Sequence, residues 1–304
     1  MPDIAMRFHK DMLVCGDSIR TTLSRQGADV DSDFEMLVLI EQDSLQDAYR
    51  VEKATNAQCM VVESGGFTPA RLAYKNMIDR LPELAKSSLE VVAECRPQHI
   101  LVEVEPCGLP LDGSSRASLK ENRDQYARVA RAYEAAGEFD GFLLSGFGGT
   151  VPLKCALMGL RMASDKPVLA CVSLGEGGNL ANGRETLEDA VAVMVEYGAS
   201  VAGFQTAAGP EEAVAIAKRV VAACDLPVMA VLEVACRNPR QGYPTRENPY
   251  FDASQMFDVA LELRAAGVQF LRAAGDASPA YTGGLAACLA GLSVRDVRGI
   301  LDRE

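Results

Sequence analysis

Histidine and tryptophan are scarce in this chain of 304 residues, which contains two histidines and no tryptophan. Basic residues are also outnumbered, because 30 lysines and arginines face 42 aspartates and glutamates, for a formal net charge of −12. Nucleic-acid binding depends on clustered basic side chains, so we expect no nucleic-acid partner. No apolar run reaches the ~18 residues that a membrane-spanning helix needs, and we expect no membrane partner either.

Cysteine, in contrast, occurs nine times. An odd number of thiols in a chain of this size predicts reduced cysteines and a cytoplasmic location, since disulfides need an oxidising compartment. The sequence contains no C-x-x-C or C-x-H pair of the kind that often binds zinc. Buried packing therefore explains the thiols most simply, because free cysteine is among the most buried residue types.

Short, almost continuously apolar runs recur along the chain, and each gap between them has room for a helix. Such runs are typical of parallel strands that helices cover on both faces. The predicted strands are residues 12–15, 59–62, 100–104, 142–144, 168–172, 201–204, 228–232 and 268–271. Eight strand–helix units predict an α/β fold, a single (β/α)8 TIM barrel spanning one domain, residues 1–304. An open, doubly wound sheet is the alternative.

Helix boundaries are clearest in the second half of the chain. Thr186 and Asp189 have the spacing of a capping box, and Pro210 suits the first position of a helix. Ser254 is expected to cap a helix that runs to Ala266. Two polar stretches, residues 106–118 and 237–250, predict long loops after the third and seventh strands, on the face where barrel enzymes place their active sites.

Residues 166–210 resemble the homocysteine S-methyltransferase family, which includes the homocysteine domain of cobalamin-dependent methionine synthase and betaine–homocysteine methyltransferase. The likeness rests on GRETLEDA at 183–190 and GASVAGFQT at 198–206, where the family has G-x-T/S-L-E-x-A and G-A-x-x-x-G-x-N-C. Weaker likenesses follow the same order at CGDSIRTTL (15–23), ESGGF (63–67) and GVQFLRAAGDASP (267–279). Together they cover most of the chain, and the family fold they imply is also a TIM barrel.

The family's zinc ligands are replaced in this chain. In the family, three cysteines bind a zinc ion that activates the sulfur of homocysteine as a thiolate. One cysteine ends the sixth strand and two adjacent cysteines end the eighth. By alignment with the family these positions hold Thr206, Ala273 and Ala274. The resemblance, with these replacements, implies a degenerate zinc and homocysteine site, and we expect no zinc and no other cofactor.

Two further family positions also differ. The family holds the amino group of homocysteine with a glutamate at the end of the fourth strand, where this chain has Ser145. The aspartate of the family's opening motif is displaced, since Gly16 takes its place and Asp17 follows one residue later. These departures argue against homocysteine as the ligand.

Charged residues nevertheless end several predicted strands. If Glu105, Glu233 and Arg272 converge at the mouth of the barrel, they would form a charged pocket for an amine or a zwitterion. Alternatively, Glu103 or Glu105 pairs with an arginine or lysine on a helix and is structural. The predicted substrate-binding residues are Asp17, Glu63, Glu105, Ser145, Thr206, Glu233 and Arg272. No catalytic residue and no metal ligand is assigned.

Two functions fit these observations. The first is a methyltransferase of the homocysteine S-methyltransferase type that works without the family's zinc or on another small acceptor. The second is a non-catalytic relative that binds a small ligand or a corrinoid protein. A lyase or aldolase is a weaker alternative, because imine formation needs a lysine at a strand end and Lys154 is predicted to lie within a helix.

Overall fold

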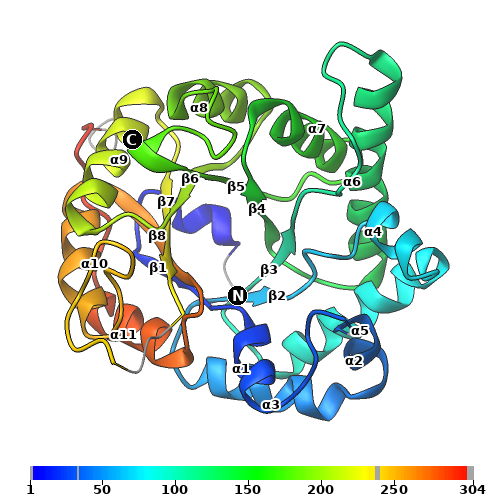
Figure 1. Cartoon of the computed structure of the whole chain (residues 1–304), viewed down its shortest axis with the longest axis horizontal. Helices are drawn as coiled ribbons and strands as arrows, with labels where there is room; N and C mark the ends of the chain where they lie inside the picture. The colour runs from blue at the N-terminus through cyan, green and yellow to red at the C-terminus, as the bar shows by residue number, and fades with distance from the viewer. Residues whose placement is uncertain (1–2, 33, 237–239, 300–304) are drawn as a thin grey trace.

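A closed barrel of eight parallel strands forms the centre of the molecule, and helices surround it (Figure 1). The computed structural model describes residues 3–32, 34–236 and 240–299. Each strand pairs with the next along the chain, and β8 pairs with β1 to close the ring. The strands are β1 (Leu13–Cys15), β2 (Cys59–Val62), β3 (His99–Val104), β4 (Gly141–Phe147), β5 (Val168–Ser173), β6 (Val201–Thr206), β7 (Val228–Val234) and β8 (Val268–Gly275). The predicted (β/α)8 barrel is confirmed, and the open sheet is wrong.

The helices depart from one per crossover in the first part of the barrel, where the β1–β2 connection holds three and the β2–β3 connection holds two and a short 3-10 helix. The α-helices are α1 (Ile19–Arg25), α2 (Phe34–Ile40), α3 (Gln42–Lys53), α4 (Pro69–Tyr74), α5 (Leu81–Glu94), α6 (Arg116–Ala136), α7 (Thr150–Arg161), α8 (Leu187–Glu196), α9 (Pro210–Ala223), α10 (Gln255–Ala265) and α11 (Pro279–Leu289). The 3-10 helices are η1 (Ile4–Arg7), η2 (Ile78–Arg80) and η3 (Glu176–Gly178). No helix among the described residues has the length and apolar character needed to cross a bilayer.

Two of the three predicted helix starts are confirmed. Thr186 and Asp189 form a reciprocal capping box at α8, and Pro210 is the first residue of α9. The predicted Ser254 cap is wrong, because Ser254 has helical backbone angles (φ −62°, ψ −25°) and its hydroxyl caps no backbone N–H of α10. A capping serine typically needs non-helical backbone angles, so that its hydroxyl oxygen can accept a hydrogen bond from a backbone N–H of the first helical turn.

All eight predicted strands exist, and several run further than their apolar cores. For example, β4 continues to Phe147, β7 to Val234 and β8 to Gly275. The added residues include polar side chains at the carboxyl ends of the strands. The predicted loop at 106–118 ends earlier, because α6 begins at Arg116. Residues 240–250 of the loop after β7 contain neither helix nor strand, whereas 237–239 lie outside the described residues.

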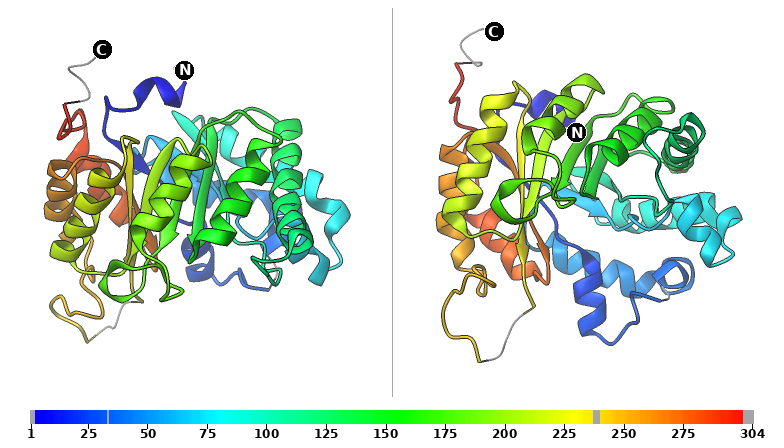
Figure 2. Two further views of the ribbon diagram at one scale, coloured as in Figure 1. Left: turned by 90° about the horizontal axis from the view of Figure 1, so that it is seen from above. Right: turned by 45° about the horizontal axis from the view of Figure 1, so that its top comes forward.

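The amino-terminal end of the barrel is closed by apolar side chains. Ile4 of η1 is fully buried against the inward-facing cluster that includes Leu13 and Phe270. Phe8 adds an edge-on contact to Phe270, with ring centroids 5.9 Å apart. The described segments nearest the two termini lie at this end, whereas residues 240–250 of the loop after β7 lie at the opposite end (Figure 2). The carboxyl end of the barrel is therefore bordered by the loops that join strands to helices.

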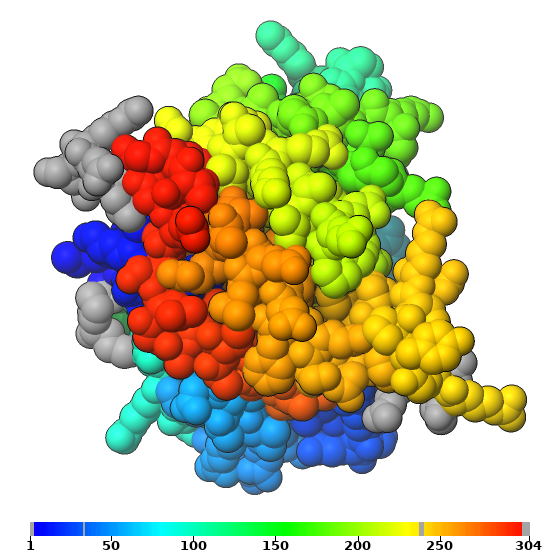
Figure 3. Space-filling model, turned by 90° about the vertical axis from the view of Figure 1, so that its left-hand side faces the viewer, coloured from blue at the N-terminus to red at the C-terminus, as the bar shows by residue number. Residues whose placement is uncertain are grey.

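The side of the molecule seen in Figure 3 is covered largely by α10 and α11, and residues 240–250 of the loop after β7 project beyond them. This loop and the β3–α6 loop border the carboxyl end of the barrel. In TIM barrels that end carries the binding residues, while the opposite end serves stability. The polar strand ends described next therefore occupy the expected place for a site.

Candidate functional site

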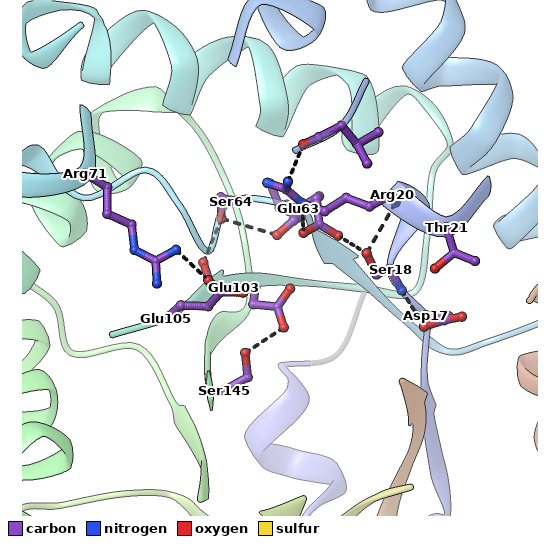
Figure 4. A network of polar contacts seen from close by, with 12 residues as sticks. Asp17, Ser18, Arg20, Thr21, Glu63, Ser64, Arg71, Glu103, Glu105 and Ser145 are labelled. Atoms are coloured by element: carbon purple, nitrogen blue, oxygen red, sulfur yellow. Dashed lines mark hydrogen bonds and ion pairs between the residues drawn. The ribbon is translucent and has the colours of Figure 1, made fainter. Parts of the chain in front are cut away.

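Alternation along the strands determines which side chains face the barrel axis. Leu13, Cys15, Leu101 and Leu143 belong to the inward-facing apolar cluster. Because successive side chains of a strand point to opposite faces, Asp17, Glu103 and Ser145 continue these inward rows toward the carboxyl end. Figure 4 shows these three residues with Glu63 and Glu105 in one network of polar contacts. The barrel interior thus changes from apolar to charged at its carboxyl end.

A buried ion pair crosses the interior from β8 to β3. The Arg272 Nη1 atom lies 2.6 Å from Glu103 Oε1, and both residues are almost fully buried. Arg272 Nε also donates to the carbonyl of Gly16, and Ser145 Oγ donates to Glu103 Oε1 at 2.8 Å. Burial alone would raise the pKa of Glu103, but the charge and hydrogen bond of Arg272 hold it below its usual value. Both groups are therefore charged at neutral pH.

Glu63 anchors a second cluster, formed with the start of α1. Ser18 Oγ donates to Glu63 Oε2 at 2.6 Å, and Arg20 Nε lies 2.8 Å from Glu63 Oε1 (Figure 4). Arg20 also lies over the ring of Phe34, 3.9 Å from its centroid. Both of these donors come from the start of α1, so this short segment fixes the orientation of the Glu63 side chain.

Glu105 pairs with a helix, as the structural alternative proposed. Its Oε2 atom lies 2.9 Å from Arg71 Nη1 on α4, and both side chains are partly exposed. Burial and the neighbouring charge of Glu103 raise the pKa of Glu105, and Arg71 opposes that shift. A Cβ at Gly65 would lie 2.5 Å from the Glu105 side chain, so a larger residue at 65 would force the Glu105 carboxylate to move. Arg272 thus pairs with Glu103 and not with Glu105.

Asp17 holds an acceptor that no described group satisfies. Its Oδ1 accepts from the Ser18 N–H at 2.6 Å, and its backbone N–H donates to Glu52 Oε1 at 3.0 Å. Its Oδ2 is buried and has no hydrogen-bond partner among the described residues. Burial raises the pKa of Asp17 to about 8, although Arg272 opposes the shift. Asp17 is therefore largely protonated at neutral pH.

A second unsatisfied acceptor lies on β6. Gln205 Nε2 donates to Glu233 Oε1 of β7 at 2.6 Å, while Gln205 Oε1 is buried without a partner among the described residues. Gln205 is in the inward row, because a Cβ at Gly203, two residues earlier, would meet Cys171 and Met229 of the interior. Unsatisfied buried acceptors are rare and call for an explanation.

Thr206, by the same alternation, faces the helix layer with Phe204. Its hydroxyl accepts from the Ala208 N–H at 3.1 Å. The structure therefore does not bring Thr206 into the charged network, whereas it does bring together Asp17, Glu63, Glu105, Ser145 and Arg272. Among the described residues, Glu233 is hydrogen-bonded to Gln205 and to no member of that network. Whether any of these residues binds a substrate stays a prediction.

Several members of the network were not among the predicted site residues. Three of them lie on helices: Arg20, Glu52 and Arg71. Gln205, which contacts Glu233, lies on β6 next to the predicted Thr206. The signal that could have found Gln205 is the alternation in β6, since Gln205 and not Thr206 shares parity with inward-facing Val201. Alternation could also have found Glu103, because residues two apart on a strand point to the same face and Glu103 therefore faces the barrel axis as Leu101 does.

The three positions that the sequence resemblance aligned with zinc ligands, Thr206, Ala273 and Ala274, hold no set of metal-binding side chains. Thr206 pairs with Leu232 of β7 and Leu232 pairs with Ala273, so Thr206 and Ala273 lie at the same level of the barrel with β7 between them. Two alanines offer no donor atom, and the threonine points away from the axis. Among the described residues, no group of three histidine, cysteine, aspartate or glutamate side chains is arranged to hold a metal ion. That the protein works without zinc stays a prediction.

Comparisons with known proteins show the fold of this chain. No protein-family model matches it, and no curated protein sequence matches it. The homocysteine methyltransferase MmuM from Escherichia coli has a similar structure in its metallated form (TM-score 0.74, 16% identity) and its oxidized form (0.73, 17%). Its apo form gives a TM-score of 0.69 at 16% identity, and each comparison covers 91% of this chain and 96% of that one. At this identity the likeness establishes a shared barrel fold alone.

Proposed function

We propose that this protein is a methyltransferase-type barrel that binds a small amine or zwitterion at its carboxyl end and methylates a small acceptor without thiolate-bound zinc. The fold shared with MmuM and the family motifs at 183–206 support the class of reaction. The observation that carries the ligand class is the buried Oδ2 atom of Asp17, which has no donor among the described residues. An ammonium group would supply that donor as the Asp17 carboxyl group, protonated at neutral pH, gives up its proton on binding.

The charge balance of the network supports the same ligand. Carboxyl groups outnumber guanidinium groups around the barrel axis, and each arginine is already paired with a glutamate. A second acceptor, Gln205 Oε1, also lacks a donor. A ligand that brings N–H donors therefore completes hydrogen bonds on both sides of the barrel, whereas an anion would meet more carboxylates. Buried acceptors left without donors cost free energy, which such a ligand recovers.

The replaced zinc positions support an acceptor other than a zinc-activated thiol. A thiol needs a metal or a base to become a thiolate at neutral pH. An amine needs only to lose a proton, and the Glu105 carboxylate is a partly exposed group near the network that we assign to accept it. The methylated atom is therefore proposed to be nitrogen: its lone pair would form the N–C bond while the methyl–cobalt bond of a methylcobalamin donor breaks and cob(I)alamin leaves.

Thermal unfolding with a ligand panel tests the proposal. Glycine and its N-methylated derivatives are expected to raise the unfolding temperature, while acetate, which lacks the ammonium group, is expected not to do so. Asp17→Asn should abolish the shift, and Thr206→Val, a matched change of an outward-facing residue, should preserve it. If acetate and glycine act alike, or if homocysteine binds tightly with stoichiometric zinc, the proposal is wrong.

The non-catalytic alternative is favoured by the same lack of zinc ligands at 206, 273 and 274. Such a relative would bind the small ligand, or a corrinoid protein, and transfer no methyl group. Incubating the protein and a bound amine with methylcobalamin separates the two functions. Mass spectrometry should detect the methylated amine if the chain is catalytic, whereas ligand binding without any methylated product would establish the binding role.

A further inference from the structure

A cavity of about 790 Å³ lies at the rim of the barrel, outside the charged network. Its walls come from the loops that follow β3, β4 and β5, from the first turn of α7 and from the face of α6 that carries Asn122 and Tyr126. Small-molecule sites in proteins typically have volumes of roughly 300 to 1,000 Å³, so this cavity has the size of a ligand pocket. None of the predicted site residues lines it.

The polar groups of Cys107 and Asn122 at the floor of this rim cavity form hydrogen bonds within the protein. The Cys107 N–H donates to the Tyr126 hydroxyl at 3.0 Å, and the Cys107 thiol donates to Asn122 Oδ1 at 3.2 Å. Asn122 Nδ2 in turn donates to the carbonyl of Pro110. With these groups satisfied, the surface offered to an occupant consists mainly of Leu109, Leu111 and Val151, whose side chains are partly exposed.

Two charged residues, Glu185 and Arg184, lie at the edge of the rim cavity, and only Glu185 is hydrogen-bonded through its side chain to described residues. Glu185 accepts from the Thr150 backbone N–H at 2.9 Å, and from the Thr150 hydroxyl and Asn182 Nδ2. The amino-terminal end of α7 is therefore already occupied by a carboxylate of the chain itself. The Arg184 side chain is exposed and forms no ion pair with any residue that the structure describes. The cavity thus has one cation at its edge that lacks a counter-charge.

We propose that the rim cavity binds an apolar organic anion, with its apolar body against Leu109, Leu111 and Val151 and its anionic group against Arg184. Burial of the apolar body removes exposed leucine and valine surface from water, which supplies most of the affinity. The guanidinium supplies a charge-assisted contact and so selects an anion. The proposed ligand is opposite in charge to the ligand of the barrel mouth, so the two sites are distinct.

Two dyes with nearly the same apolar body test this inference on the whole chain. Anilinonaphthalene sulfonate carries an anion, and N-phenylnaphthylamine does not. Both are expected to bind the wild-type protein at one site. Arg184→Gln should weaken sulfonate binding by about fivefold, as expected for a partly exposed charge contact, and leave the neutral dye unaffected. The matched control Arg128→Gln removes an exposed charge from α6 and should change neither dye.

Filling the cavity provides the second arm of the test. Val151→Trp should abolish binding of both dyes, and because the chain has no tryptophan of its own, the new side chain reports its own burial by fluorescence. Dye binding that survives Val151→Trp, or equal loss of both dyes in Arg184→Gln, would overturn the proposal. No saturable binding of either dye to the wild-type protein would do the same. If Val151→Trp fails to fold, the exposed Arg184 variant still decides the question.

Discussion

The two ends of the barrel interior are built from opposite kinds of side chain. At the amino-terminal end, Ile4 and Phe8 close the interior with apolar contacts. At the carboxyl end, Arg272, Glu103 and Asp17 place charge and an unsatisfied acceptor in almost equally buried surroundings. An apolar end costs nothing to bury, whereas buried charge is expensive unless it is paired. The buried charge at the carboxyl end thus supports the ligand site proposed above.

The largest effect should follow from breaking the buried ion pair. Arg272→Met leaves Glu103 buried without its partner and should lower the free energy of unfolding by about 3–5 kcal/mol. Urea denaturation measures this change. The double variant Arg272→Met/Glu103→Leu should recover most of the loss, because no buried charge remains. A loss below about 1 kcal/mol in the single variant would mean that the pair is not desolvated as described.

The next largest effect belongs to the apolar end. Ile4→Ala removes a fully buried side chain of the interior cluster and should cost about 2–4 kcal/mol in the free energy of unfolding. At a temperature where the variant remains folded, its affinity for the amine should equal that of the wild type. Weakened amine binding in this variant would contradict the separation of the two ends.

Asp17 should make stability depend on pH in a characteristic direction. Its pKa rises from the ordinary aspartate value of 3.8 to about 8 on folding, so the folded state keeps a proton that the unfolded state has lost. The contribution of this group is therefore fully present below about pH 4 and is lost as the pH rises toward 8. Between about pH 6 and pH 8 the wild type should lose about 2 kcal/mol that Asp17→Asn retains. Parallel pH profiles of the two proteins, measured by urea denaturation, would refute the assignment.

The smallest effect should come from the rim pair. Arg71→Gln breaks the ion pair with Glu105, in which both side chains are about one-third exposed, and should cost no more than about 1 kcal/mol. The loss should shrink further in concentrated salt, because solvent screens this pair. A cost equal to that of Arg272→Met would show that exposure does not separate the two pairs, and thermal unfolding with and without salt decides this.

The barrel itself was predictable because eight apolar runs of strand length mark its interior. The charged strand ends were also predictable, since Glu63, Glu105 and Arg272 directly follow or end those runs. Their partners were not, because Arg272 and Glu103 lie 169 residues apart and Arg71 reaches Glu105 from a helix. Sequence position alone carries no information on such pairs.

Thr206 shows the limit of transferring a site from a resembling family. The alignment placed it where a zinc ligand stands, but alternation along β6 puts Gln205 on the axis and Thr206 against the helices. The unsatisfied Asp17 Oδ2 could not have been found from sequence either. Whether an acceptor lacks a donor depends on every neighbouring element, including Glu52 on α3 and Arg272 on β8.

Calorimetric titration of an amine in buffers of different ionisation enthalpy tests the central claim most directly. If the ammonium group binds beside protonated Asp17, it lowers the pKa of that carboxyl and releases its proton. We predict that binding near pH 7 releases close to one proton per wild-type chain and none from Asp17→Asn. An amine that binds the wild type without proton release, or that binds both proteins with the same release, would contradict the account.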